Sequence, residues 1–118
     1  MKALPSLAVA LALMAPPAAA HHGWAAYSDE EASVAGVVVS ASLGQPHGVI
    51  KVRTDQGVWD VMLAPPAAIQ RAGLTLEAIP AGTRVTARGH KRIDGTPEIK
   101  TERLVVGGRT YDLYPARR

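Results

Sequence analysis

Hydrophobic and polar residues alternate along much of the chain after residue 31, and this two-residue period is typical of half-buried β-strands. In residues 32–43, for example, Ala35, Val37 and Val39 share one face, and Val34 and Val38 share the other. Strands are predicted over residues 32–43, 49–54, 58–64, 83–92, 98–106 and 110–114. Segments rich in Gly, Pro and Asp separate several of these runs and indicate turns.

One segment breaks the alternation and predicts a short helix. Pro65 and Pro66 end the third predicted strand, and Pro66 suits the first turn of a helix because an N–H is not needed there. The helix would carry Ile69 inward and end at Gly73, a residue that favours helix termini. A further turn is predicted over residues 75–79.

Turn length decides which side chains face each other in a hairpin, because a one-residue slip moves every side chain to the opposite face. We expect three-residue turns at residues 55–57 and 94–96. The second turn predicts the cross-strand pairs Arg92–Glu98, Arg88–Glu102 and Val85–Val105. This register places His90 with the arginines on the outward face of its strand.

The order of elements predicts the fold. Three strands, a helix and further strands follow one another in the five-stranded oligonucleotide/oligosaccharide-binding (OB) barrel. We therefore predict an all-β protein: a small OB-like barrel of five to six strands, with one short helix between strands 3 and 4. The barrel would span residues 32–114, between an N-terminal arm at 21–31 and a C-terminal tail at 115–118.

The first twenty residues have the pattern of a secretory signal peptide. Lys2 precedes an uncharged apolar run that is too short for a membrane span, and the small residues Ala18 and Ala20 favour cleavage after Ala20. The mature chain would then begin at His21. We expect a periplasmic or secreted protein with no membrane span in its mature chain.

The composition narrows the chemistry that this domain can perform. The chain has no cysteine, so thiolate ligands are excluded and a metal would be bound by nitrogen and oxygen. Its formal net charge of +3 is too small to indicate a polyanionic partner by itself. Phe is absent and aromatic residues make up 4% of the chain, which argues against nucleic-acid binding because OB barrels stack bases on aromatic rings.

Several motifs together resemble a family of small exported bacterial proteins of unknown function. They are HHGW at 21–24, QPHG at 45–48, LAPP at 63–66, GL at 73–74 and GG at 107–108. Mature chains of that family open with His-His-Gly-Trp and carry a Pro-His-Gly loop, which usually begins with Asn where this chain has Gln45. The resemblance covers the whole mature domain and implies an exported, barrel-like protein with no established activity.

A histidine at a free chain end can chelate a metal. The amine and Nδ1 of His21 can hold one ion, and one further imidazole would complete a T-shaped three-nitrogen site that suits copper. Such a site resembles the histidine brace of copper monooxygenases and periplasmic copper carriers. His22 or His47 would supply the imidazole, and we favour His47 because adjacent side chains point apart in an extended chain. Cleavage after Ala19 would instead make His21 the second residue and His22 the third, a register that gives a square-planar site for Cu(II) or Ni(II).

The other histidine, His90, ranks second to His47 because Arg88 and Arg92 flank it and nearby cations disfavour a further positive centre. The simplest interpretation of His90 is a solvated side chain. Trp24 and Tyr27 are expected to pack the arm against the barrel and to limit access of solvent to a metal.

These observations predict a non-enzymatic binding module that captures copper through His21, His22 and His47 for storage, delivery or sensing. The alternative is an interaction or structural module that docks a peptide or an envelope protein without a metal. An enzyme is disfavoured because the sequence shows neither paired carboxylates nor a nucleophile beside a base.

Overall fold

The computed structural model describes residues 23–117, in which six strands, one α-helix and two 3-10 helices follow one another. The strands are β1 (Ala32–Ser42), β2 (Val49–Thr54), β3 (Gly57–Met62), β4 (Arg84–Lys91), β5 (Glu98–Val106) and β6 (Arg109–Asp112). The helix α2 covers Pro66–Ala72, and the 3-10 helices η1 and η2 cover Leu76–Ala78 and Pro115–Arg117. All the predicted elements are present.

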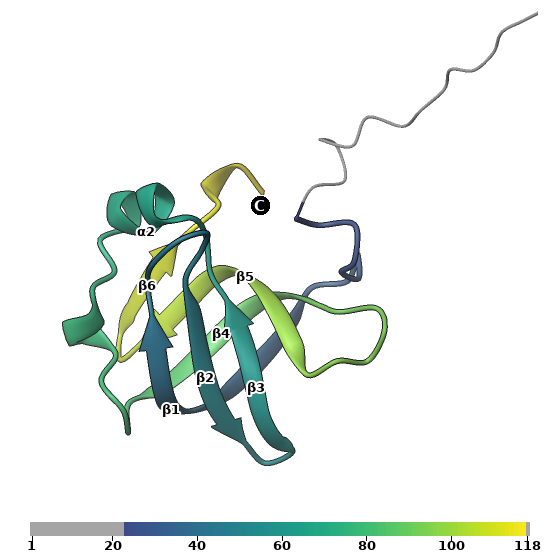
Figure 1. Cartoon of the computed structure of the whole chain (residues 1–118), viewed down its shortest axis with the longest axis horizontal. Helices are drawn as coiled ribbons and strands as arrows, with labels where there is room; N and C mark the ends of the chain where they lie inside the picture. Colours follow the sequence, from purple (N-terminus) through teal and green to yellow (C-terminus); the bar gives the residue numbers. More distant parts are fainter. Residues whose placement is uncertain (1–22, 118) are drawn as a thin grey trace, which may run out of the picture.

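The strands form a closed barrel. Their order is β3-β2-β1-β4-β5-β6, and a parallel pairing of β3 with β5 joins the two sides of the sheet (Figure 1). Five strands therefore close the barrel, while β6 extends it beside β5. This topology confirms the predicted OB-like barrel with its helix between the third and fourth strands.

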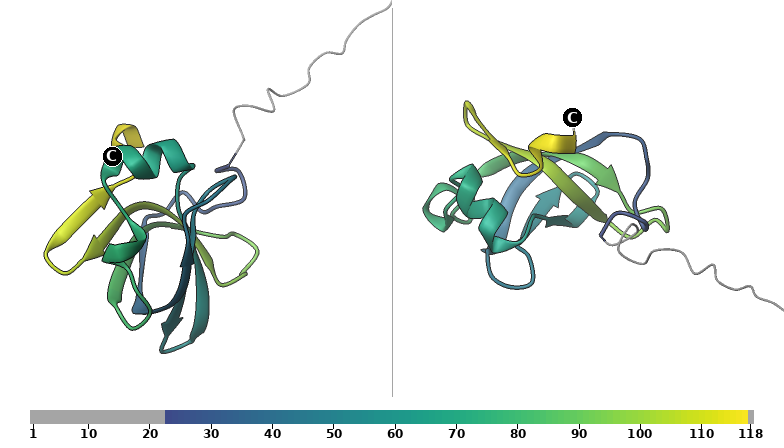
Figure 2. Two further views of the ribbon diagram at one scale, coloured as in Figure 1. Left: turned by 60° about the vertical axis from the view of Figure 1, so that its left-hand side comes forward. Right: turned by 90° about the horizontal axis from the view of Figure 1, so that it is seen from above.

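The helix α2 lies across one end of the barrel, on the same side as the C-terminal segment (Figure 2). Pro66 begins the helix, and Gly73 ends it with a φ of 83°, in the left-handed region that favours glycine. Ile69 is the buried residue of α2, as the sequence predicts. In the described part of the chain, no helix has the length and hydrophobicity needed to cross a membrane.

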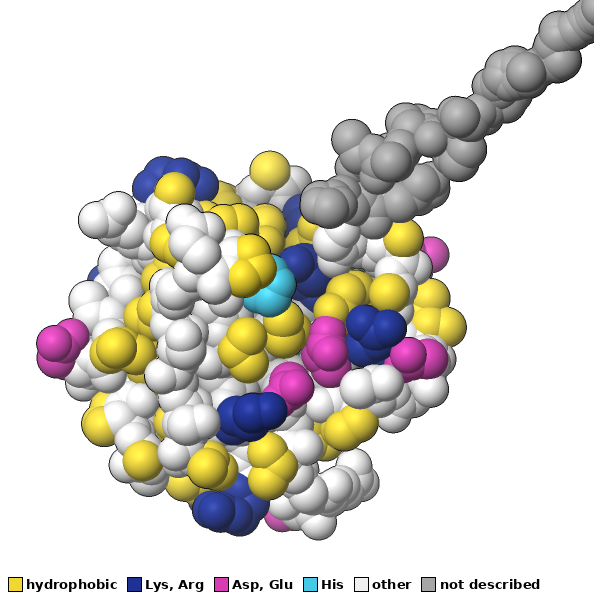
Figure 3. Space-filling model, in the orientation of Figure 1, with side chains coloured by type: hydrophobic (Ala, Val, Ile, Leu, Met, Phe, Trp, Pro, Cys, Tyr) yellow, Lys and Arg dark blue, Asp and Glu magenta, His cyan; other side chains and the backbone are white. Residues whose placement is uncertain are grey.

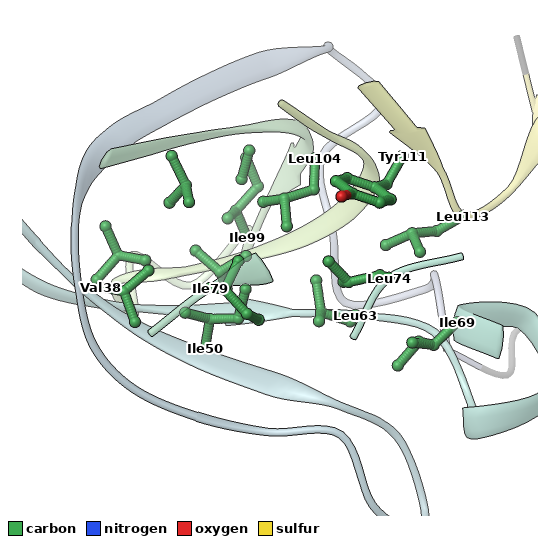
Figure 4. Packing of buried hydrophobic residues seen from close by; sticks show 14 of the residues in the cluster. Val38, Ile50, Leu63, Ile69, Leu74, Ile79, Ile99, Leu104, Tyr111 and Leu113 are labelled. Atoms are coloured by element: carbon green, nitrogen blue, oxygen red, sulfur yellow. The ribbon is translucent and has the colours of Figure 1, made fainter. Parts of the chain in front are cut away.

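The core fills the interior of the barrel with aliphatic side chains from the strands and from α2 (Figure 4). Its fully buried members include Ile50, Val61, Leu63, Ile99 and Leu104. Burial of these apolar groups is the main force that stabilises a domain of this size. Trp59, predicted to face the core, packs against it at the edge and remains partly exposed.

A β-bulge changes the predicted register between β4 and β5. Arg92 lies opposite Glu98, as predicted, and its N–H donates to the Glu98 carbonyl. The register then shifts between Arg88 and Gly89, so that Arg88 faces Arg103 and Val85 faces Val106. The predicted pairs Arg88–Glu102 and Val85–Val105 are wrong because the bulge adds one residue to β5 and no alternation in the sequence marks it.

The turn between β2 and β3 is also shorter than predicted. Thr54 pairs with Gly57, which leaves two residues, not three, between the strands. Gly57 has a φ of 101°, and the Thr54 hydroxyl donates to the Gly57 carbonyl at 2.8 Å. The glycine therefore begins β3 and does not lie in the loop.

Candidate functional site

The described part of the N-terminal arm packs along the outside of the β4–β5 hairpin. Ser28 N–H donates to the Lys91 carbonyl at 2.8 Å, and Ile93 N–H donates to the Ala26 carbonyl at 2.9 Å. Tyr27 forms a β-bridge with Arg92. These backbone contacts attach residues 26–28 to the barrel as a short extra strand.

Trp24 attaches the arm to the barrel through its ring. The guanidinium of Arg117 lies 3.7 Å from the ring centroid, and the ammonium of Lys100 lies 5.2 Å from it. The rings of Tyr114 and His90 meet Trp24 edge-on, at centroid distances of 5.2 and 5.9 Å. Cations and ring edges at these distances stabilise an aromatic ring, so the expected packing of Trp24 against the barrel is confirmed.

The loop that carries His47 is attached to the end of β3. Gly48 N–H donates to the Ala64 carbonyl, and the Leu63 N–H donates to the Gly48 carbonyl at 2.8 Å. A Cβ at Gly48 would lie 2.8 Å from the δ-carbon of Ile69 and 3.2 Å from the Ser42 carbonyl oxygen, so the glycine lets the loop pack closely against these neighbours. The Gln45–Pro46 peptide bond in the same loop is cis.

The arm and this loop border one cavity of about 680 Å³. It is lined by Gly23, Trp24, Ala25, Ala26, Tyr27, Pro46, His47, Met62, Pro65, Arg92, Lys100 and Tyr114. Met62 and Lys100 are register partners in the parallel β3–β5 pair, so the cavity lies where the barrel closes. On this side of the molecule, hydrophobic side chains gather around a histidine, with Lys or Arg nearby (Figure 3). Its size is typical of a small-molecule site.

His47 is half-buried at this cavity, and its Nδ1 atom is fully buried without a hydrogen-bond partner among the described residues. A buried polar atom without a partner costs about 1–3 kcal/mol. Such atoms are rare in native proteins, and strain, a catalytic role, a water molecule or an ion can account for them.

His90 differs from the prediction. It is buried, 8% exposed, where the sequence predicts a solvated side chain on the outward face of β4. Nδ1 donates to the Glu30 carbonyl at 3.1 Å, and Nε2 lies 3.0 Å from the Glu102 carboxylate. The arm covers this face of β4, so alternation alone could not identify His90 as buried. Both ring nitrogens are engaged, which leaves His90 unsuited to hold a metal.

A second buried carboxylate contact fixes the arm near the cavity. The Tyr27 hydroxyl donates to Glu98, whose carboxylate also faces the Arg92 guanidinium at 3.8 Å. Burial, followed by the hydrogen bond and the negative charge of Glu98, raises the pKa of Tyr27 to about 12. The phenol therefore remains protonated and keeps donating at physiological pH.

Two of the three predicted metal ligands, His21 and His22, lie outside the described residues. Between residues 23 and 117, no three His, Asp or Glu side chains form a group that could hold a metal ion. His47, the third predicted ligand, lines the same cavity as Gly23, which follows His22 directly.

Sequence reasoning missed Lys100 as a site residue. On β5, Glu98, Lys100 and Glu102 follow one another at intervals of two, which is the pattern of a strand face exposed to solvent. Lys100 is nevertheless mostly buried, because the arm crosses this face. The aromatic residues of the arm, Trp24 and Tyr27, are the signal that could have indicated a covered patch on the barrel.

The fold and this cavity define a small OB-like barrel domain whose N-terminal arm borders a ligand-sized cavity. The chain matches the model of a family of unknown function, DUF6152, over residues 9–100, and it belongs to that family. No curated protein and no solved structure matches it.

Proposed function

We propose that this protein is an exported, non-enzymatic module that binds copper at its mature N-terminus. His21 would supply its free amine and one ring nitrogen, and His47 or His22 would supply a further imidazole. Three nitrogens in a flattened arrangement suit Cu(II) better than other divalent ions.

One observation carries the proposal: the buried, unpartnered Nδ1 of His47 belongs to a cavity that Gly23 and Trp24 also line. Gly23, the first described residue, therefore lines the same cavity as the histidine that we favoured as the distant ligand. Both ring nitrogens of His90 have hydrogen-bond partners, so His47 is the described histidine with a ring nitrogen that could bind a metal.

The packing of Trp24 supports the same proposal. A metal site at a chain end needs that end to be held in place, because a freely moving terminus would lose entropy on binding. Trp24 contacts side chains from β4, β5 and the C-terminal segment, and it lies two residues after His22. These contacts attach the arm to the barrel from Trp24 onward.

Calorimetric titration with Cu(II) tests this proposal on protein that begins at His21. We expect one-to-one binding, at least tenfold weaker when an extra glycine precedes His21 and at least tenfold weaker in His47→Ala. Gln45→Ala, in the same exposed loop, is the matched control and should bind as the unmodified protein does. Equal affinity of the native, glycine-extended and His47→Ala proteins would overturn the proposal and favour the interaction module without a metal.

A further inference from the structure

Lys100 is a mostly buried lysine whose ammonium forms no ion pair in the described part of the chain. Its residue is 8% exposed, and within residues 23–117 its ammonium makes no hydrogen bond and no ion pair. It faces the rings of Trp24 and Tyr114 at 5.2 and 5.8 Å. Aromatic faces attract a cation, yet they replace only part of the water that a partly desolvated ammonium gives up.

The surroundings of Lys100 are more positive than negative. Its cavity is lined by two cationic side chains, Lys100 and Arg92, and by no described Asp or Glu. Glu98 is the carboxylate whose negative charge favours the charged form of Lys100. It already accepts a hydrogen bond from Tyr27 and forms an ion pair with Arg92. Burial lowers the pKa of Lys100, and the positive charge of Arg117 adds to this while Glu98 opposes it.

Apart from Lys100, Arg92, His47 and Tyr27, the walls of the cavity are mostly apolar. Trp24, Tyr114 and Met62 line it together with Lys100, and Pro46 and Pro65 are also part of the lining. A cavity of about 680 Å³ with apolar walls and one or two charged groups is typical of a site for a small organic molecule. The positive charge of Lys100 favours a ligand with a negative charge, and the apolar walls favour a ligand with an apolar body.

The geometry points to a binding site for a small organic carboxylate, with its carboxylate on the Lys100 ammonium and its aromatic or short alkyl body against Trp24, Met62 and Tyr114. A charge-assisted hydrogen bond between an ammonium and a carboxylate is about twice as strong as a neutral one and would give the Lys100 ammonium an anionic partner. The site goes beyond copper binding and does not require His21 or His22.

The experiment uses the two tryptophans of the chain, Trp24 and Trp59. Trp59→Phe leaves Trp24, which lines the cavity, as the single fluorescent tryptophan. Benzoate is titrated at pH 7 into this protein, prepared with a glycine before His21 and in the presence of EDTA. Metal binding then cannot contribute, so failure here and failure of the copper proposal are distinguishable. Calorimetry on the same samples measures affinity independently of fluorescence.

We expect saturable binding of benzoate and at least tenfold weaker binding of benzamide, which has the same shape without the charge. Lys100→Met should weaken benzoate binding at least tenfold, whereas Lys100→Arg retains it. Lys51→Met is the matched control, because Lys51 is an exposed lysine paired with Asp60 at 2.8 Å on the neighbouring strand pair. Thermal unfolding of each variant shows whether it is folded.

Three results would overturn the proposal. Benzoate could bind no more tightly than benzamide, which would leave the charge of Lys100 without a role. Folded Lys100→Met could bind benzoate as tightly as Lys51→Met. Inorganic phosphate could bind as tightly as benzoate, which would show a site for anions in general and none for an apolar body.

Discussion

Gly89 lies where the bulge on β5 presses against β4. A Cβ at this position would lie 1.9 Å from the carbonyl oxygen of Lys100, a backbone atom that cannot move without breaking the strand pair. The register of the hairpin shifts between Arg88 and Gly89. The missing side chain therefore permits the bulge, and the bulge decides which residues of β5 lie opposite Arg88 and Val85.

Gly89→Ala is expected to lower the free energy of unfolding by about 3 kcal/mol, at the upper end of the cost of overpacking, because the added carbon meets backbone. Urea denaturation measures the change. The control is Gly108→Ala, at a position where an added Cβ meets nothing within 4 Å and φ is not positive. It should stay within about 0.5 kcal/mol of the parent. Equal losses in the two variants would contradict this account.

His90 and Lys100 show what a one-dimensional pattern cannot reveal about a site. Each is polar and falls in a row that alternation assigns to solvent, yet each is 8% exposed. The reason is tertiary: Trp24 and the residues after it cover that row. By contrast, the inward position of Ile69 was predictable, because Pro66 and Gly73 fix the helix that carries it.

The arm behaves as an element of its own, because separable contacts hold it to the barrel. Ser28 N–H and Ile93 N–H take part in its backbone hydrogen bonds, and Trp24 supplies its side-chain anchor. Amide exchange reports local opening separately from global unfolding.

Trp24→Ala should therefore raise the exchange rates of the Ser28 and Ile93 amides at least tenfold, while amides within β1 and β2 keep most of their protection. Hydrogen exchange followed by NMR makes this comparison. Trp59→Ala is the matched control, since Trp59 contacts Lys91 on the other side of β4 and its loss should leave the arm amides protected. If the Trp24 variant exchanged like the parent at Ser28 and Ile93, the backbone contacts alone would hold the arm.

Strands and helix were predictable because each is encoded by neighbouring residues: alternation for the strands, and Pro66 with Gly73 for α2. The pairing inside the β4–β5 hairpin was predictable only up to the bulge. Closure of the barrel by the parallel β3–β5 pair followed from the order of elements and not from any local signal.

The stability of the whole molecule at alkaline pH is expected to respond to one proton, that of the Tyr27 phenol where the arm meets the barrel. The neutral Tyr27 phenol donates to Glu98, and its loss of a proton would place two anions in contact where the arm meets β5. The folded pKa of Tyr27 is raised to about 12, above the usual value of 10 that applies in the unfolded chain. A raised folded pKa gives stability that is present in full below pH 10 and is lost as the pH rises through about 12.

Two pKa units correspond to about 2.7 kcal/mol, and solvent screening at this half-buried ring reduces the figure to about 1–2 kcal/mol. The stability of the parent protein relative to Tyr27→Phe should thus fall by that amount between pH 8 and pH 12, because deprotonation of Tyr27 costs more in the folded chain than in the unfolded one. Urea unfolding at pH 8, 10 and 11.5 gives the difference, and absorbance at 295 nm shows whether the last tyrosinate to form disappears in the variant. A difference that stayed constant across this range would mean that the Tyr27 proton does not link the arm to the barrel. Any alkaline loss of stability would then arise from another group. The half-buried Tyr114 phenol, whose pKa burial also raises, is the next group to replace.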